Sequence, residues 1–283
     1  MPELPEVQTV TDQLNRKIIG KKITRFWSDW RKQIFPSFVV FARNIKGAKV
    51  LGARRFGKHI VIDLDNKYSI MAHFKMTGHF LVKDSLNRKS SAFIKDSKNQ
   101  YIHHVITFTD GTTLEFSDMR KFGWLRVVKT AEVETFESIS VLGIDALSSK
   151  LTIKYFQELF LRKRERSIGT VLLEQTLVAG IGNIYRSEVL FLAGILPTRL
   201  VKNLKPDKWN KLLSVIKTIL RKAVKMRGTS DSDFRDTDGL EGGFQRILYV
   251  YARDGKACKK CGTIILRKKI GQRSVFYCIK CQK

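Results

Sequence analysis

The stretch between residues 59 and 74, HIVIDLDNKYSIMAHF, decides the fold of the first half of the chain. Valine, isoleucine and other apolar residues fill both of its ends, and Asp65 and Asn66 stand between them. Strands favour β-branched and aromatic residues, whereas tight turns favour Asp and Asn. The stretch therefore predicts two neighbouring strands joined by a turn.

A second hairpin signal lies in residues 103–116, HHVITFTDGTTLEF. Asp110 and Gly111 separate two runs rich in Val, Ile, Thr and Phe, and an Asp-Gly pair suits the short turns of hairpins. Strand-like patterns extend over residues 21–128. We expect this region to form a β-sandwich or barrel.

Helical spacing marks the start of the chain. Apolar residues recur there three or four positions apart, ahead of a stop at Gly20: Val7, Val10, Leu14 and Ile18. Residues 3–19 are therefore predicted to form one amphipathic helix that leads into the β-rich region.

The second half of the chain carries mainly helical patterns. We expect helices in residues 151–163, 167–175, 183–194 and 206–226. The third of these is predicted to start with Asn183 as its N-cap and to stop at Gly194, because these residue types suit those positions.

These patterns predict an α+β protein of two domains. An N-terminal β-sandwich with a leading helix is expected in residues 1–131, and a linker in residues 132–149. A helical domain is expected in residues 150–283, with a zinc finger in residues 250–283 at its end. The chain of 283 residues is long enough for two such cores.

All four cysteines lie near the end of the chain: Cys258, Cys261, Cys278 and Cys281. Two C-x2-C pairs separated by sixteen residues match the ligand spacing of a zinc ribbon, which predicts one structural Zn²⁺ per chain. The intervening residues 263–277 resemble a hairpin with Gly271 near its tip. A pair of disulfides is the alternative, and the finger could also serve only to staple the tail.

Cationic residues decorate this module: Lys259, Lys260, Arg267, Lys268, Lys269, Arg273 and Lys280. Arg273, near the hairpin tip, is a candidate phosphate contact. The whole chain has 53 Lys and Arg against 26 Asp and Glu, a formal charge of +27. Such an excess favours a nucleic-acid partner, although a solubilising surface is the simpler alternative. With neither a membrane-length apolar run nor a secretory signal, an intracellular protein is expected.

Six blocks of the sequence occur in the order found in formamidopyrimidine-DNA glycosylases, and the chain resembles this family from end to end. They are MPELPEV at 1–7, RRFGKHIVI at 54–62, HFKMTGHF at 73–80, DMRKFGWL at 118–125, VAGIGNIYRSEVLFLAGILP at 178–197 and CKKCGTIILRKKIGQRSVFYCIKC at 258–281.

The resemblance implies a two-domain DNA-repair enzyme with damaged double-stranded DNA bound in a cleft. Its C-terminal domain would contain a helix–two-turns–helix motif and the zinc finger. Such enzymes flip out and excise oxidised purines, notably 8-oxoguanine and formamidopyrimidines, and then cut the abasic strand by β,δ-elimination. The chain would thus be both a glycosylase (a hydrolase) and an AP lyase, acting as a cytoplasmic monomer away from membranes.

The resemblance also assigns catalytic residues. Once Met1 is removed, Pro2 presents an α-amine, which titrates near 8 and is far more often neutral at pH 7 than a lysine side chain. That amine would form a Schiff base with the sugar C1′. Glu3 would be the proton donor, with Lys58 serving β-elimination and Arg273 δ-elimination, both near phosphates. Glu6 would support the N-terminus, or simply supply negative charge at a helix start.

Other residues would hold the DNA. Met76, Arg120 and Phe122 would fill the gap left by the flipped base, since a wedge, a cation and an aromatic ring suit that task. Core packing of Met76 and Phe122 and a solvated Arg120 are the alternatives.

The backbone around the lesion would be pinched by His73, Asn183, Tyr251 and Arg273. Asn183 also has a physical argument, since a helix N-terminus offers N–H groups to a phosphate. His73 alone would suit a core, and Lys58 alone a surface.

The loop 228–243 would close over the base, with Thr229 and Ser230 in the base-recognition segment. The sequence departs from the family at Phe74 and Lys75, at Met119 and at Lys121, which bears on fine substrate preference. The related endonuclease VIII branch, which prefers oxidised pyrimidines, typically has glycine in place of Leu4. A binding-only DNA module and a zinc-ribbon RNA-binding protein are the rival hypotheses.

Overall fold

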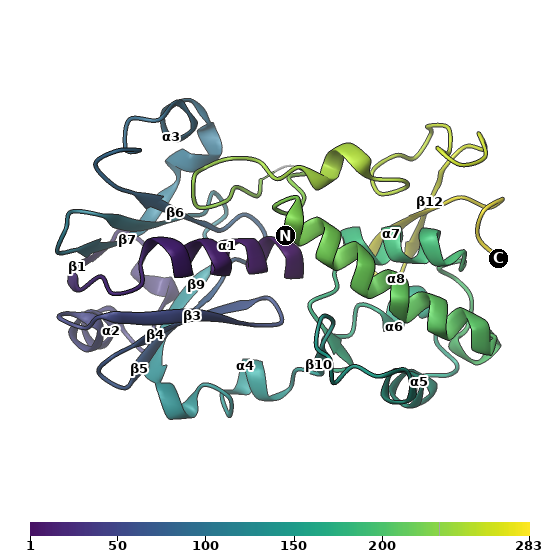
Figure 1. Ribbon diagram of the computed structural model, residues 1–283, viewed down its shortest axis with the longest axis horizontal. Helices are drawn as coiled ribbons and strands as arrows, with labels where there is room; N and C mark the ends of the chain where they lie inside the picture. The colour runs from purple at the N-terminus through teal and green to yellow at the C-terminus, as the bar shows by residue number, and fades with distance from the viewer. Residues whose placement is uncertain (232) are drawn as a thin grey trace. The chain divides into compact units, whose positions relative to one another are not determined.

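The computed structural model describes residues 1–231 and 233–283 (Figure 1). Residue 232, in the loop expected to close over the base, lies outside the described residues. By packing, the described chain divides into two compact units: an N-terminal unit of Met1–Ser140 with Met226–Gln245, and a C-terminal unit of Val141–Lys225 with Arg246–Lys283. The domain boundaries expected from the sequence stay a prediction.

The N-terminal unit begins with helix α1, Leu4–Lys17, close to the predicted bounds. Its other helices are α2 (Phe38–Ile45), α3 (Ser91–Lys95) and α4 (Glu137–Ser140). Its strands are β1 (Ile23–Ser28), β2 (Ile34–Phe35), β3 (Val50–Phe56), β4 (His59–Leu64), β5 (Tyr68–His73), β6 (His79–Lys83), β7 (Ile102–Phe108), β8 (Thr113–Ser117) and β9 (Trp124–Lys129). Both hairpins that the sequence predicts are present: β4 pairs with β5, and β7 with β8, each antiparallel.

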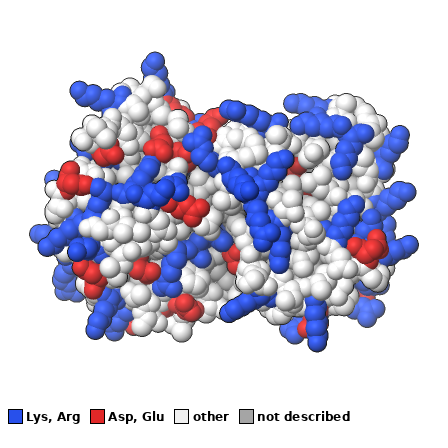
Figure 2. Space-filling model, viewed as in Figure 1, with Lys and Arg blue, Asp and Glu red and all other residues white. Residues whose placement is uncertain are grey.

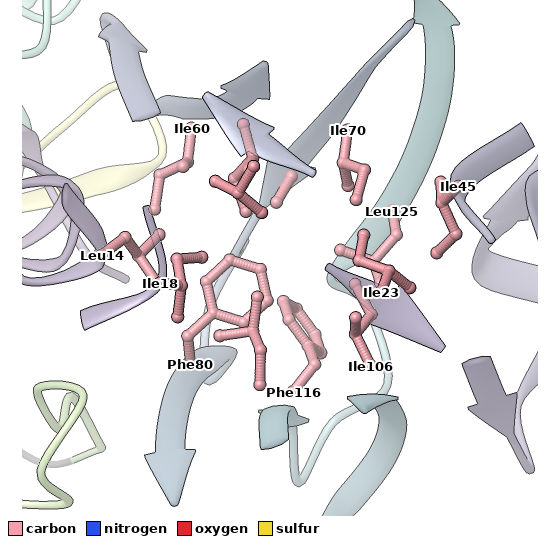
Figure 3. Packing of buried hydrophobic residues seen from close by; sticks show 14 of the residues in the cluster. Leu14, Ile18, Ile23, Ile45, Ile60, Ile70, Phe80, Ile106, Phe116 and Leu125 are labelled. Atoms are coloured by element: carbon pink, nitrogen blue, oxygen red, sulfur yellow. The ribbon is translucent and has the colours of Figure 1, made fainter. Parts of the chain in front are cut away.

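Within the described residues, these strands form a four-stranded sheet in the order β1–β7–β8–β6 and a five-stranded sheet in the order β2–β9–β5–β4–β3. Apolar side chains of both sheets meet in one core, to which Leu14 of α1 contributes (Figure 3). Ile60 and Ile70 come from the five-stranded sheet, and Phe80 and Phe116 from the four-stranded one. The predicted β-sandwich with a leading helix is confirmed. It forms because alternate apolar residues, such as Ile106 and Phe108 of β7 and Leu114 and Phe116 of β8, bury one face of a sheet in this core.

The C-terminal unit is mainly helical. It contains α5 (Ile153–Leu161), α6 (Ile168–Val171), α7 (Asn183–Ala193), α8 (Pro206–Lys225) and the short parallel pair β10 (Ile144–Asp145) and β11 (Val178–Ala179). The predicted hairpin near the C-terminus is confirmed as β12 (Leu266–Ile270) paired with β13 (Arg273–Tyr277).

The prediction that Asn183 is the N-cap of its helix is wrong. Gly182 is the N-cap of α7, and Asn183 is its first helical residue. The Asn183 side-chain oxygen accepts a hydrogen bond from the Arg186 guanidinium at 2.6 Å instead of capping the helix. The predicted stop is confirmed, since Gly194 ends the helix with φ of 70°.

Candidate active site and DNA-contact residues

The N-terminus of α1 gathers the predicted catalytic groups. Pro2 is buried, and Glu3, the N-cap residue of α1, is 2% exposed. The Glu6 carboxylate, 1% exposed, accepts the Glu3 backbone N–H at 2.8 Å. Two buried carboxylates therefore lie at the positive end of a helix dipole, beside the position where a proline amine would react.

The sequence does not reveal a second role of Glu6. Its other oxygen, Oε1, accepts the backbone N–H of Thr229 at 2.7 Å. One buried carboxylate thus joins the start of α1 to the loop that the resemblance assigns to base recognition. Gly228 makes room for this contact, because a Cβ built on it would lie 2.6 Å from Glu6 Oε1.

Other described residues of this loop are also held by hydrogen bonds. Ser230 is 8% exposed; its hydroxyl donates to the Phe234 carbonyl at 2.7 Å, and its N–H donates to Gln245 at 3.1 Å. Farther along, the Thr237 N–H donates to Gln13 of α1 at 2.9 Å. Thr229 and Thr237 are therefore hydrogen-bonded to α1, whereas Ser230 is held by residues nearer to it in the sequence.

Lys58 lies in the turn between β3 and β4 and is 7% exposed. Arg55 braces this turn: its Nη1 donates to the Gly57 carbonyl and its Nε to Gln8 of α1, both at 2.8 Å. The turn that carries Lys58, a predicted proton donor, is therefore fixed relative to α1.

His73 ends β5, opposite His59, and stacks on Trp124 with ring centroids 6.0 Å apart. Burial lowers the pKa of His73 well below 6.5, and the nearby charges of His59, Lys75 and Lys58 lower it further. The neutral ring accepts the Lys75 N–H on Nδ1 at 2.9 Å, so its proton resides on Nε2. His73 can thus donate a hydrogen bond to a phosphate oxygen without carrying charge.

Asp118 holds together the two loops that carry the predicted gap-filling residues. Its Oδ1 accepts from the Thr77 hydroxyl and, at 3.2 Å, from the Arg120 N–H, and its Oδ2 accepts the Gly123 N–H at 2.7 Å. Neither Thr77 nor Asp118 was singled out from the sequence. Both lie within the sequence blocks that resemble the glycosylase family, but only the folded chain shows that their side chains are hydrogen-bonded to each other.

The residues predicted to fill the gap are at least partly exposed. Phe122 is 50% exposed, with the Arg120 guanidinium 4.9 Å above its ring, and Met76 is half-buried. Exposure on this scale argues against core packing for Phe122. Lys75 and Lys121, beside them, adopt the left-handed conformation with φ of 52° and 57°. Such backbone costs about 1 kcal/mol for a non-glycine residue and is typical of functional loops.

The C-terminal unit holds the remaining predicted contacts. Asn183 is half-buried at the start of α7. Glu188, farther along α7 and 0% exposed, accepts the backbone N–H groups of Tyr249, Val250 and Tyr251, each at 2.9 Å. Burial raises the pKa of Glu188, and these N–H bonds oppose the rise. Glu188, which the sequence did not single out, therefore anchors the segment that presents Tyr251.

The four cysteines form one cluster with all ligand atoms within 4.8 Å of one another. Sulfur atoms of Cys258 and Cys281 are 3.9 Å apart, and those of Cys261 and Cys278 are 3.5 Å apart, too far for disulfides. Four thiolates around a Zn²⁺ at about 2.3 Å would lie about 3.8 Å apart, so the donors fit a structural zinc. Arg273 is exposed at the start of β13, beyond the cluster.

Lys and Arg side chains spread over the visible face of the molecule and outnumber acidic ones (Figure 2). The structure places Pro2, Glu3, Glu6, Lys58, His73, Met76, Arg120, Phe122, Thr229 and Ser230 in the N-terminal unit, and Asn183, Tyr251, Arg273 and the four cysteines in the C-terminal unit. Among the described residues, no helix is both long and apolar enough to span a membrane.

Comparison with known families assigns most of the chain. Residues 1–125 match the formamidopyrimidine-DNA glycosylase N-terminal domain, residues 142–235 its H2TH domain, and residues 255–283 the zinc finger found in FPG and IleRS. A formamidopyrimidine-DNA glycosylase of Pelotomaculum thermopropionicum is 37% identical over 284 residues, covering 100% of this chain and 99% of that protein. The chain belongs to the formamidopyrimidine-DNA glycosylase family.

Solved structures of the Lactococcus lactis member agree with this assignment. Its complex with DNA containing N7-benzyl-Fapy-dG is 30% identical, with a TM-score of 0.88 and 100% of each chain covered. Its complex with DNA containing an oxidised pyrimidine is 29% identical, with a TM-score of 0.87 and the same coverage. The predicted H2TH domain and zinc finger of the glycosylase family are thereby confirmed for this chain.

Proposed function

We propose that this chain excises oxidised purines from damaged double-stranded DNA and then cuts the abasic strand, with Pro2 as the nucleophile. The family assignment supports the reaction class. The observation that carries the assignment to residues is the burial of Glu3 and Glu6 at the amine end of α1, 2% and 1% exposed. The enzyme would act as a monomer, and a cytoplasmic location beside the DNA would suit that role.

In the proposed first step, the neutral amine of Pro2 attacks the sugar C1′. The bond from C1′ to the base breaks, and the base leaves with the electron pair and takes up the proton that the Pro2 nitrogen loses on bonding to C1′. Glu3 gives a proton to the ring oxygen, so the sugar opens to an iminium joined to Pro2. Burial keeps water from competing with Glu3 for that proton.

Elimination follows from the iminium, which draws electrons from the sugar. Loss of a C2′ proton expels the 3′ phosphate, and a second elimination expels the 5′ phosphate. Lys58, fixed by Arg55, would serve the first elimination, and Arg273 the second. Hydrolysis of the iminium nitrogen–carbon bond frees Pro2.

His73, Asn183 and Tyr251 would hold the DNA backbone, and Met76, Arg120 and Phe122 would fill the gap in the duplex. Thr229 and Ser230 would line the flipped base. The zinc held by the four cysteines would keep the β12–β13 hairpin folded, so that Arg273 can reach the DNA.

The test uses a labelled duplex with one 8-oxoguanine opposite cytosine, with and without borohydride. We expect a covalent complex with borohydride and strand cleavage without it. The matched control is the same chain extended by Gly-Ser ahead of Pro2, which keeps every side chain but converts the amine to an amide. That chain should bind DNA and neither trap nor cut it; trapping at the wild-type rate would refute the role of Pro2.

The Lactococcus lactis complex with an oxidised pyrimidine favours testing a second substrate. The same assay on a duplex with one oxidised pyrimidine should proceed more slowly than on 8-oxoguanine. Faster cleavage of the pyrimidine duplex would instead place this chain with the endonuclease VIII branch in substrate preference.

A further inference from the structure

Arg186 of α7 is a buried cation that the proposed reaction does not use. Its side chain is 0% exposed. Its guanidinium donates from Nη1 to the Gly169 carbonyl at 3.0 Å, and from Nη2 to Asn183 Oδ1 at 2.6 Å and the Ser274 carbonyl at 2.8 Å. Burying a guanidinium is costly even when it is hydrogen-bonded, so a residue that served packing alone would be better apolar.

The bond to Asn183 fixes which way its amide faces. A guanidinium carries donors only, so the atom that meets it is the amide oxygen. The amide NH2 group is thereby committed to ligands that accept hydrogen bonds. A phosphate oxygen is such a ligand, whereas a cation or another donor is not.

The hydrogen bond to the Ser274 carbonyl links Arg186 to the strand of Arg273, the second predicted phosphate contact. Ser274 follows Arg273 in β13, and the same Nη2 atom serves both Asn183 and Ser274. One side chain thus links the start of α7 to the strand that carries Arg273. Asn183 and Arg273 lie 90 residues apart in the sequence, in separate matched blocks.

We propose that Arg186 is a positioning residue that sets the Asn183 amide as a phosphate donor and fixes the Arg273 strand against α7. The two contacts then bind the DNA backbone as one unit. This inference rests on the proposed roles of Asn183 and Arg273.

The test is a double-mutant cycle on affinity for a duplex with a tetrahydrofuran abasic analogue, which the enzyme cannot cut. Arg186→Met keeps length and removes every donor. We expect Asn183→Ala and Arg186→Met each to weaken binding about tenfold, the value of one hydrogen bond to a charged group. The double variant should bind no more than about threefold more weakly than Arg186→Met alone. Effects that multiply to about a hundredfold would overturn the coupling while leaving the role of Asn183 intact.

The control pair combines Arg186→Met with Arg120→Ala from the N-terminal unit. Sites that share no hydrogen-bond partner add in free energy, so these effects should multiply. If neither Asn183→Ala nor Arg273→Ala weakens binding, the phosphate roles of these residues fail and the proposal for Arg186 fails with them. If borohydride still traps these two variants on DNA at the wild-type rate, the proposed reaction stands even though the proposal for Arg186 fails.

The salt dependence of DNA binding distinguishes positioning of Arg273 by Arg186 from a purely structural role of Arg186. Arg273 would release about one counterion on binding, so Arg273→Ala should reduce the slope of log affinity against log salt by about one. Arg186→Met should reduce this slope by a similar amount if the substitution misplaces Arg273; an unchanged slope would contradict this part of the proposal.

If Arg186→Met loses zinc, Asn183→Asp replaces it in the test. Aspartate keeps the acceptor for Arg186 and lacks the NH2 donor, so binding should weaken at least as much as with Asn183→Ala; wild-type affinity would overturn the proposal.

Discussion

Replacing Glu188 should destabilise the segment that contains Tyr251, because its backbone N–H groups donate to the Glu188 carboxylate. The Glu188 carboxylate is 0% exposed and accepts the N–H groups of Tyr249, Val250 and Tyr251 at 2.9 Å each. Glu188→Ala leaves these donors without the carboxylate, at about 1–3 kcal/mol for each one that stays buried. The burial that raises the pKa of Glu188 offsets part of this loss, because the variant no longer buries a charge. We expect a net cost of about 3 kcal/mol.

Glu188→Gln should cost less, about 1–2 kcal/mol. Val250 and Tyr251 both donate to Oε1, so a glutamine oxygen in that position keeps both bonds. The amide NH2 would then face the Tyr249 N–H, which donates to Oε2 in the native chain. One clash between donors remains.

The assay follows zinc release from the finger in urea with a coloured zinc indicator, which reports on the C-terminal unit. With a slope of roughly 2 kcal/mol per molar urea, a cost of about 3 kcal/mol lowers the midpoint by about 1.5 M. Glu165→Gln is the matched control, since this glutamate is exposed and pairs with Lys202 on the surface. Its midpoint should stay within about 0.25 M. A midpoint for Glu188→Ala as close to wild type as that of the control would refute the reasoning.

Three further changes test other parts of the structure. Gly228→Ala should lower the free energy of unfolding by about 2–3 kcal/mol and slow borohydride trapping, because the new Cβ would lie 2.6 Å from Glu6 Oε1. Gly20→Ala is the control, since Gly20 has nearly the same φ but a Cβ there has nothing within 4 Å. It should cost only the backbone strain of about 1–2 kcal/mol and leave trapping unchanged. Burial lowers the pKa of His79 from 6.5 to about 4, so the stability that the neutral ring contributes is complete above pH 6.5 and is lost as the pH falls toward 4. Between pH 7 and pH 4.5, the free energy of unfolding in urea should therefore fall less for His79→Gln than for the native chain. An equal fall in both would contradict this. Cys258→Ser should release zinc and weaken DNA binding at least tenfold, and undiminished binding by zinc-free protein would refute a structural role for the metal.

Local pattern was enough to predict the elements of this fold. Hairpins β4–β5, β7–β8 and β12–β13 follow from runs of strand-forming residues around turn residues, and α1 and α8 follow from apolar residues at helical spacing. The cysteine spacing predicted the zinc cluster, because two C-x2-C pairs can meet around one ion whatever the rest of the chain does. Family motifs, not periodicity, pointed to Pro2, and its role as nucleophile is still a prediction.

The sequence by itself therefore determined which segments are strands and helices, where the metal ligands stand and which family the chain resembles. Only the tertiary structure decided which buried polar groups are partners. Glu6 meets Thr229 across 223 residues of sequence, and Arg186 meets Ser274 across 88. Asn183 was expected to cap α7, yet its oxygen binds Arg186. The physical reason is that periodicity reports which face of an element is apolar, whereas a buried donor takes the acceptor that packing brings within reach.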